Sequence, residues 1–432
     1  MADVRAYRAA LVHCLDDPAK AGEEAVVWHP DGLLLVEDGH VADCGDWTAL
    51  SPCLAADTPV EHLPGQILTP GFIDTHIHFP QIDMIAAFSG QLLDWLKERT
   101  FPAERAFADR AHADDAARAF LDELLRNGTT TAMVFGSVHR ASVDALFEAA
   151  LARDMRLIAG KSLMDLGPDG LADTAAGGRA ETESLIADWS RRGRLGYAVT
   201  PRFALSSSRE QLAAAGEILR AYDHVWLQTH LAESPQEVAQ VAEAFNGSRD
   251  YLDVYDQFGL VTGRSVFAHC IHMTPRSLDR MAETGAAIAH CPTSNLFLGS
   301  GLFDLAEADA HGVKTALGTD VGAGTSFSML TTAAAACNVA QMRASPLDPL
   351  RAFYLATRGG ARALGLEDRI GSFTVGCEAD FVALDPAATP LLARRLKDVS
   401  DIREILFALM VLGDDRVVAR TWLAGRPAHN RD

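Results

Sequence analysis

The sequence predicts an α/β protein, a (β/α)8 TIM-like barrel with a small β-sandwich domain formed by both termini. Two observations carry this prediction. Apolar stretches of strand length alternate with helical stretches through the middle of the chain, which is typical of a parallel sheet wrapped by crossover helices. Eight such stretches can be counted, the number of strands in that barrel. They are residues 71–78, 129–135, 156–164, 194–203, 224–230, 264–270, 286–292 and 313–320.

The two ends of the chain share a different pattern, short strands separated by turns, without the alternating helices. Residues 25–30 and 31–45 read as short strands, with turns expected at Asp31-Gly32 and Asp38-Gly39, and residues 373–385 and 415–427 read the same way. We therefore expect residues 1–66 and 375–432 to build one β domain, and residues 67–374 to form the barrel. The length of 432 residues suits this division, because such a barrel takes roughly 250 residues or more by itself.

Helix boundaries inside the barrel region support the alternation. The helix expected over 114–127 meets Gly128 just before the second strand, as a left-handed C-terminal cap would. After the fifth strand, Ser234, Pro235 and Glu237 offer an N-cap, a first-turn proline and a capping-box glutamate. Both signals place a helix where a crossover connection needs one.

Charge and cysteine content exclude several classes of protein. The formal net charge is −20, from 38 Lys and Arg against 58 Asp and Glu, which disfavours nucleic acid and anionic membranes and favours a small neutral or cationic substrate. The seven cysteines include no CxxC pair, so reduced thiols are expected. No apolar run approaches 18 residues. We expect a soluble cytoplasmic protein.

Residues able to bind a metal end four of the eight predicted strands. His76 and His78 end the first, His230 the fifth and His269 the sixth, and Asp320 ends the eighth. Active sites of such barrels lie at the carboxyl ends of the strands. One such histidine alone would be an ordinary buried side chain, but five metal-capable residues at these ends indicate a common site. Imidazole and carboxylate ligands suit Zn²⁺ or Fe²⁺, and an open water position makes the site hydrolytic.

These motifs resemble the amidohydrolase superfamily. The resemblance lies in PGFIDTHIH, HLAE, the AH of the sixth strand, LGTD and GSFTVGCEADFVALD, which span nearly the whole chain. Within the superfamily, HIHFPQ, LLDWLKERTFPAE, TPRFALS, HCPTSNLFLGSG and LGTDVGAGTSFSM are similar to the guanine deaminase family. That family implies a barrel with a terminal β-sandwich, usually a homodimer, that converts guanine and water to xanthine and ammonia in purine catabolism.

The resemblance implies one Zn²⁺ per chain, with Fe²⁺ as an alternative. Its ligands would be His76, His78, His230, His269 and Asp320. Superfamily members with two metals usually carry a carboxylated lysine at the end of strand four, where this chain has Arg202 and Phe203. A single metal is therefore expected. Lys161 lies near the end of strand three and is expected to be a structural or substrate-side lysine.

The resemblance also assigns the acid/base chemistry. Glu233 follows His230 by three residues and would carry protons to the ring nitrogen and to the leaving amine. The alternative for Glu233 is an exposed first-turn glutamate favoured by the helix dipole. Asp320 would serve as the second acid/base group.

Recognition of guanine is assigned to residues beside the metal ligands. Arg202 would donate to O6 and N7, Phe203 would stack on the purine, and Gln81 would offer a donor and an acceptor to the ring edge. Taken singly, these residues also fit a surface ion pair, a core aromatic and a polar loop residue.

Four further residues lie near this site in sequence. Trp95 belongs to a lid that excludes water or is simply packed, and His272 is expected to touch the substrate. His139 and His290 are expected to orient ligands or to be structural.

Three rival functions stay open at this point. The first is a related deaminase or chlorohydrolase acting on another aminopurine, a pterin or a triazine. The second is a dinuclear amide hydrolase, and the third is a noncatalytic barrel, although no ligand has been lost. A cytidine-deaminase-like fold is excluded because the sequence lacks the H-x-E and P-C-x-x-C elements.

Overall fold

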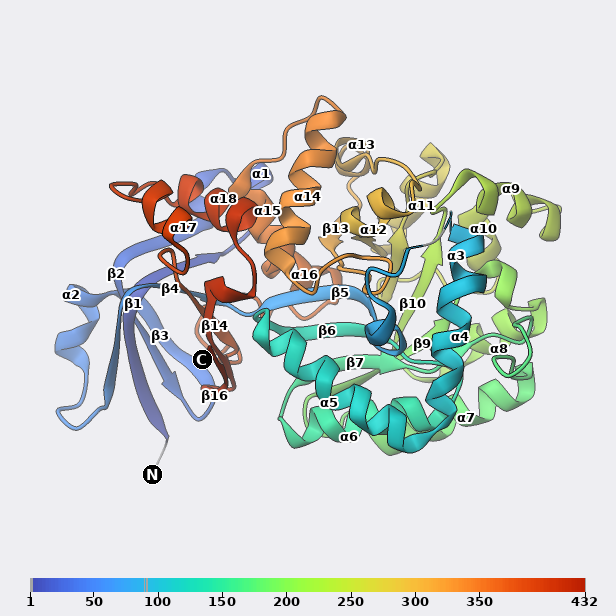
Figure 1. Ribbon diagram of the computed structural model, residues 1–432, viewed down its shortest axis with the longest axis horizontal. Coiled ribbons are helices and arrows are strands. Elements are labelled where there is room, and N and C mark those ends of the chain that lie inside the picture. Colours follow the sequence, from blue (N-terminus) through green and yellow to red (C-terminus); the bar gives the residue numbers. More distant parts are fainter. Residues whose placement is uncertain (1–2, 89, 91, 432) are drawn as a thin grey trace.

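The computed structural model describes residues 3–88, 90 and 92–431. It contains two large sheets (Figure 1). In that view the N-terminal and C-terminal strands lie side by side on the left, and the strands of the middle of the chain lie on the right. Among the described residues, no helix has the length and apolar character needed to cross a membrane.

Eight parallel strands of the middle segment follow one another in sequence order around the second sheet. They are β5 (Phe72–His78), β6 (Thr129–Phe135), β7 (Arg156–Gly160), β9 (Leu195–Pro201), β10 (Trp226–Leu231), β11 (Ser265–His269), β12 (Ala287–His290) and β13 (Lys314–Leu317). Seven of them lie within the predicted stretches and β10 extends one residue past its stretch, to Leu231, so the barrel is confirmed. The third stretch is divided, because β8 (Ser162–Leu163) leaves β7 at Lys161 and pairs with the end of β9.

The first and last of these strands meet and nearly close the barrel. The backbone N–H of Asp320 donates to the carbonyl of His76 at 2.9 Å, and that of His78 donates to the carbonyl of Val321 at 2.9 Å. Gly318 permits this approach, since a Cβ at that position would lie 2.9 Å from the Cβ of His76. The carboxyl ends of β5 and β13 are therefore held together.

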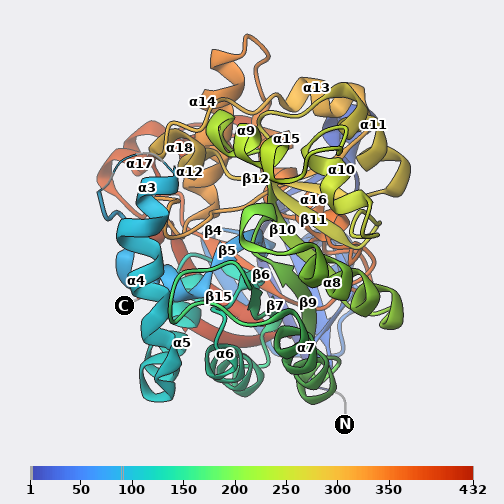
Figure 2. The same ribbon diagram turned by 90° about the vertical axis from the view of Figure 1, so that its right-hand side faces the viewer.

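Helices surround the barrel strands (Figure 2). The connections between strands contain α5 (Arg110–Arg126), α6 (Arg140–Ala152), α7 (Ala175–Trp189), α8 (Arg209–Ala221), α9 (Pro235–Ala244), α10 (Tyr251–Asp256), α11 (Pro275–Thr284), α12 (Pro292–Phe297) and α13 (Leu305–Ala310). After β13 follow α14 (Met329–Met342), α15 (Pro349–Ala356) and α16 (Arg358–Ala363). The apolar face of α5, including Phe120 and Leu124, packs in one core with Ala132 and Val134 of β6.

Both predicted helix signals are confirmed. Helix α5 ends at Arg126, and Gly128 takes a φ of 77°, a conformation that glycine adopts without strain. Ser234 accepts from the N–H of Glu237, and the Glu237 side chain closes a capping box at the start of α9.

The other sheet has seven strands from both termini. Its strands are β1 (Val4–Cys14), β2 (Val26–Glu37), β3 (His40–Asp46), β4 (Val60–Pro70), β14 (Phe381–Leu384), β15 (Val418–Leu423) and β16 (Arg426–Asn430). This confirms a separate β domain built from both ends of the chain. Strand β4 runs through residue 66 and leads past Gly71 into β5. Helices α1 (Pro18–Ala21), α2 (Trp47–Leu50), α17 (Pro390–Arg395) and α18 (Ile402–Leu412) belong to these terminal segments.

One of the two predicted turns in this domain is wrong. Asp38 and Gly39 do turn the chain, with φ values of 48° and 79°. Asp31-Gly32 does not, because β2 continues through it against the unpredicted strand β1. The register shifts between Ala9 and Leu11, and a Cβ at position 32 would lie 2.6 Å from the Leu11 side chain. The glycine marks a bulge rather than a turn.

Candidate metal and active site

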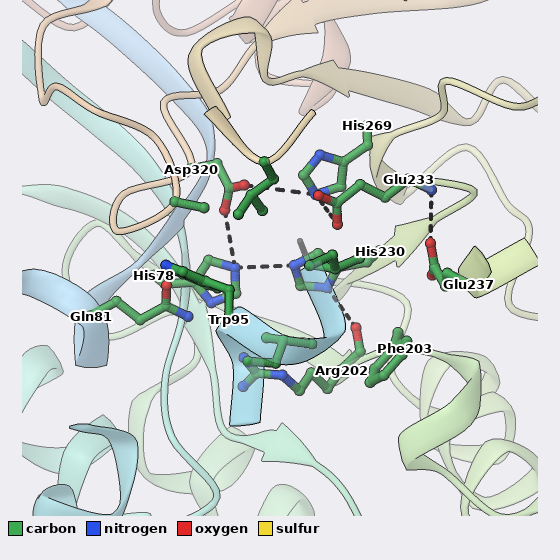
Figure 3. A pocket seen from close by; sticks show the side chains of 14 residues that line it. His78, Gln81, Trp95, Arg202, Phe203, His230, Glu233, Glu237, His269 and Asp320 are labelled. Carbon is green, nitrogen blue, oxygen red and sulfur yellow. Dashed lines mark hydrogen bonds and ion pairs between the residues drawn. The ribbon is translucent and has the colours of Figure 1, made fainter. Parts of the chain in front are cut away.

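A pocket opens at the carboxyl ends of the barrel strands (Figure 3). Its described lining combines polar side chains from the strand ends with apolar side chains from the segment that precedes α5. The lining residues are His78, Gln81, Leu92, Trp95, Leu96, Arg202, Phe203, His230, Glu233, Glu237, His269, Leu298, Asp320 and Ala323. His76 lies next to this pocket, with its ring centroid 4.8 Å from that of His230.

The five predicted metal ligands converge on one point. The Nε2 atoms of His76 and His78 lie 3.2 and 3.3 Å from Oδ1 of Asp320. The Nε2 atoms of His78 and His230 are 3.1 Å apart, and Nε2 of His269 lies 3.8 Å from Oδ2 of Asp320. Side chains that are up to 244 positions apart in sequence thus aim the same type of atom at a shared centre.

The protonation of these histidines fits a cation at that centre. Nδ1 of His230 donates to the carbonyl of Arg202 at 2.6 Å, and Nδ1 of His269 donates to Oδ1 of Asn295 at 2.8 Å. These bonds leave each Nε2 as a free lone pair, the form in which imidazole binds a metal. Burial lowers the pKa of His78 to about 4, and burial with the neighbouring histidines lowers that of His230 well below its ordinary value.

Unsatisfied polar atoms point to the same conclusion. Nε2 of His76 and Nε2 of His269 are buried and have no hydrogen-bond partner among the residues that the structure describes. Buried polar atoms are rarely left unpaired, because their desolvation is then uncompensated. A divalent cation would satisfy both atoms together with the Asp320 carboxylate. The donor set therefore fits a metal of the Zn²⁺ or Fe²⁺ type.

The backbone around the ligands is strained. His269, Cys270 and Asp320 have φ values of 69°, 52° and 54°, and Ala232 has 51°. None of these is glycine, and left-handed conformations at such residues cluster at functional sites. Asp74 joins the two strands that close the barrel, β5 and β13. Its buried carboxylate accepts from the N–H groups of His76 at 3.1 Å and Thr319 at 3.0 Å.

Glu233 is buried beside the metal ligands. It is 3% exposed, so it is not the solvent-exposed first-turn glutamate considered as the alternative. Its Oε1 accepts from Oγ of Ser300 at 3.0 Å, and its Oε2 lies 3.5 Å from Nε2 of His269. Burial and the charge of Asp320 raise the pKa of Glu233 to about 8. A carboxyl group with such a pKa can exchange a proton near neutral pH.

A second glutamate holds Glu233 in place. Oε2 of Glu237 accepts from the N–H groups of Glu233 at 2.9 Å and Ser234 at 3.3 Å. Its Oε1 accepts from the Tyr251 hydroxyl at 2.7 Å. The capping box that starts α9 therefore also fixes the turn that aims Glu233 into the pocket.

The predicted recognition residues meet at one wall of the pocket. Arg202 is only 2% exposed, so its ion pair is not the surface pair considered as the alternative. Its Nη1 donates to Oε2 of Glu104 at 2.6 Å. Nε2 of Gln81 donates to Oε1 of Glu104 at 3.0 Å, and Phe203 is half-buried at the same side. The sequence reasoning missed Glu104, although FPAE, which ends at Glu104, was part of a recognised motif.

A helical segment covers the mouth of the pocket. It comprises α3 (Leu92–Trp95), a π-helical turn (Leu96–Thr100) and α4 (Phe101–Arg105). Trp95 is buried and lines the pocket, and its indole N–H donates to the Ala87 carbonyl at 3.3 Å. This apolar cover limits the access of water to the site.

Four residues that the sequence placed near the site, His139, Lys161, His272 and His290, are not among the described residues that line the pocket. His272 lines a neighbouring cavity rather than this pocket, and its Nε2 lies 2.9 Å from the Ser300 carbonyl oxygen. His290 packs against the ring of Phe303, with ring centroids 4.6 Å apart.

Lys161 is fully buried and is not among the described residues that line the pocket. Its Nζ lies 2.7 Å from Asp173 and 3.2 Å from Glu181. His139 lies on the same side, where burial and the charge of Lys161 lower its pKa. Asn295 and the Arg202 carbonyl, not His139 or His290, accept from Nδ1 of two of the predicted metal ligands, His269 and His230.

Known proteins resemble this chain over almost its whole length. A model of the amidohydrolase family matches residues 67–428. Guanine deaminase of Escherichia coli strain K12 is 46% identical over 423 residues, covering 98% of this chain and 96% of that protein. The E. coli guanine deaminase structure has a TM-score of 0.97, covering 99% of this chain and 100% of that one. A structure of guanine deaminase from C. acetobutylicum with guanine bound in its active site has a TM-score of 0.90 at 26% identity, covering 99% and 100% of the two chains.

Proposed function

The chain belongs to the amidohydrolase family and, within it, to the guanine deaminases, and on this premise we propose that it hydrolyses guanine to xanthine and ammonia with one bound Zn²⁺. The observation that carries this proposal is the pocket itself. Four of the five candidate metal ligands line it together with Glu233, Arg202 and Gln81, and the fifth, His76, lies next to it.

The metal would be held by His76, His78, His230, His269 and Asp320. When bound, it supplies a Lewis acid that makes water nucleophilic at neutral pH. One ion is supported by the surroundings of Lys161, whose amine is already engaged by Asp173 and Glu181 and is not free to bridge two metals. Fe²⁺ satisfies the same donors, and metal analysis distinguishes the two ions.

Glu233 and Asp320 would carry the protons. As the water oxygen bonds to C2, Glu233 takes one water proton and places it on N3. The second proton of that oxygen passes through Asp320 to the amine, the C2–N bond breaks, and ammonia leaves while C2 becomes a carbonyl carbon. Burial alone would raise the pKa of Asp320, but His76, His78 and His269 hold it well below its ordinary value, so this carboxylate is ionised.

The remaining residues of the pocket would bind the base. The Arg202 guanidinium offers planar donors for the O6 and N7 acceptors of guanine. Phe203 offers a ring for stacking, Gln81 offers polar atoms to the ring edge, and Trp95 closes the space from the covering segment.

The direct test is ammonia release from guanine, adenine, cytosine, melamine and an aminopterin, together with metal content per chain. We expect turnover of guanine well above the other four compounds and one Zn²⁺ per chain. Faster release from melamine or the pterin would reassign the substrate. Two ions per chain would reassign the metal centre.

We also propose that the enzyme is a cytoplasmic homodimer. The dimer is supported by exposed apolar side chains on α17 and α18, namely Leu391, Phe407, Val411 and Leu412. The cytoplasmic assignment is supported by all seven cysteines, which are unpaired. Light scattering after gel filtration should give twice the chain mass of 46.3 kDa, and a single-chain mass would reject the dimer.

A further inference from the structure

We propose that Glu104 is a positioning residue for substrate selection: it fixes the orientation of Arg202 and Gln81 and thereby sets the preference for a 6-oxo purine. The inference rests on the proposed function. Glu104 belongs to α4 of the covering segment, far in sequence from both of its partners, and is 1% exposed. Among the described residues that line the pocket, Glu104 is absent, so it acts through the two side chains that it holds.

Each oxygen of the Glu104 carboxylate has one partner on the pocket wall. Oε2 accepts from Nη1 of Arg202 at 2.6 Å, and Oε1 accepts from Nε2 of Gln81 at 3.0 Å. A single buried carboxylate therefore contacts both of the polar groups that we assign to recognition of the base. Any displacement of Glu104 moves both groups at once.

The orientation of the Gln81 amide is determined from both of its ends. An ionised carboxylate only accepts hydrogen bonds, so Glu104 requires the NH₂ end of Gln81 to face it. A backbone N–H only donates, and the N–H of Gly322 donates to Oε1 of Gln81 at 3.1 Å. A flipped amide would be repelled at both positions. One N–H and one lone pair of Gln81 stay available to a ligand in a fixed arrangement.

The ion pair with Glu104 also compensates the buried charge of Arg202, which is the second argument for a positioning role. Arg202 is buried, and an unpaired buried guanidinium would be strongly disfavoured. Its pairing with Glu104 makes this wall neutral overall, which suits a neutral base. The ring of Phe101, also in α4, lies 5.5 Å from the guanidinium carbon and limits its movement further. The remaining N–H groups of Arg202 are thus held for a planar acceptor such as a 6-oxo group.

The competing role for Glu104 is purely structural, as a latch that holds α4 on the barrel. The two roles predict different results. A latch affects stability and all substrates equally, whereas a positioning residue changes the discrimination between purines that carry different groups at position 6. Guanine and 2,6-diaminopurine form such a pair, because the 6-amino group replaces the O6 acceptor by a donor and N1 loses its proton.

The test uses the full-length metal-loaded protein and the variants Glu104→Gln and Glu104→Asp. Glu104→Gln removes the charge but keeps the size, and Glu104→Asp keeps the charge but is too short to reach both partners. The control is Glu378→Gln, which removes a partly buried carboxylate that accepts from Nε of Arg156 and Nη1 of Arg194, both at 2.9 Å, away from the pocket. Metal content, the thermal unfolding midpoint, and kcat and KM for both purines are measured.

We expect Glu104→Gln to raise KM for guanine roughly 10- to 100-fold, the effect of losing a hydrogen bond to a charged group, with kcat changed less. The ratio of kcat/KM for guanine to that for 2,6-diaminopurine should fall about 10-fold or more, with metal content unchanged. Glu104→Asp should also lower the ratio. Calorimetric binding of xanthine to the metal-free protein should weaken by a similar factor in both variants. Glu378→Gln should lower the unfolding midpoint and leave the ratio and xanthine binding unaltered.

Two results would overturn the inference. One is an unchanged purine ratio in Glu104→Gln, with a loss of stability like that of the control. The other result concerns Glu104→Asp and is needed if Glu104→Gln does not fold. If Glu104→Asp discriminates between the two purines and binds xanthine like the wild-type protein, Glu104 is not a positioning residue. Failure of the proposed function is a separate result, because it appears as absent ammonia release from guanine in the wild-type protein.

Discussion

Replacement of Glu233 by glutamine isolates the proton transfer from the other functions of the site. Glutamine has nearly the same size, and its carbonyl oxygen can still accept the hydrogen bond that Ser300 now donates to Glu233 at 3.0 Å. Glu237 holds the backbone N–H of residue 233, a contact that does not depend on the side chain. The five metal ligands are untouched. We therefore expect Glu233→Gln to fold, to bind one metal ion and to bind guanine like the wild-type protein.

The size of the effect on turnover follows from the chemistry that is lost. A positioned acid/base group contributes roughly 10²- to 10⁴-fold to a rate, which corresponds to about 3 to 5 kcal/mol of the activation barrier. Glu233 is buried and its pKa is raised to about 8, so it exchanges protons in the range where the enzyme works. A bound cation favours its carboxylate form and places the working pKa below that value. We expect kcat to fall by roughly 10² to 10⁴.

The assay is steady-state ammonia release from guanine between pH 5 and 9, with metal content and xanthine binding measured on the same samples. The carboxylate must take the water proton, so the wild-type kcat/KM should rise with pH along a limb below about pH 8, and Glu233→Gln should lack that limb. Glu283→Gln on the exposed side of α11 serves as the control. Near wild-type turnover in Glu233→Gln, or an unchanged pH limb, would remove Glu233 from the mechanism. Loss of metal from the variant would show that the substitution disturbs the site and not only the proton transfer.

Three further predictions concern recognition, the metal and pH. Arg202→Lys should lower kcat/KM for guanine relative to 2,6-diaminopurine, because an ammonium cannot reproduce the planar donors; unchanged discrimination would contradict the role of Arg202. Removal of the metal by a chelator should abolish turnover and lower the unfolding midpoint in calorimetry, because Nε2 of His76 and Nε2 of His269 then lose the cation that satisfies them. Re-added Zn²⁺ should restore both turnover and midpoint, and an unchanged midpoint would argue against a metal at this centre. Burial lowers the pKa of His13 to about 4 from 6.5, so the stability that depends on its neutral form is complete above pH 6.5 and is lost as the pH falls toward 4, by roughly 3 kcal/mol. His13→Gln should reduce this loss in urea unfolding at pH 7 and pH 4.5, and a wild-type pH dependence in the variant would refute the assignment.

The sequence was most informative where a residue type able to bind a metal stood at the end of a predicted strand. His76, His230 and Asp320 could be predicted to converge because the carboxyl ends of parallel strands always meet at one face of a barrel. The strand pattern was sufficient for this step, and it located all eight barrel strands. No knowledge of side-chain packing was needed.

Contacts between distant elements could not be predicted in this way. Glu104 lies on a helix, Ser300 in a loop and Asn295 on another short helix, and no local pattern relates them to the residues they touch. The bulge at Gly32 was misread for a similar reason. Whether an Asp-Gly pair turns the chain or accommodates a neighbouring side chain depends on the strand opposite, and β1 had not been recognised.

Closure of the barrel and assembly of the proposed metal site are one structural event. The proposed ligands His76 and His78 on β5 and Asp320 after β13 lie on opposite sides of the junction where the first and last strands meet. The same junction is joined by the hydrogen bond from the N–H of Asp320 to the His76 carbonyl, and by Asp74, which accepts N–H groups from both sides. The left-handed backbone of Asp320 is unfavourable by itself and persists because these contacts determine it. A barrel that failed to close would separate His76 from Asp320, so the interactions that complete the fold are also those that bring the proposed metal ligands together.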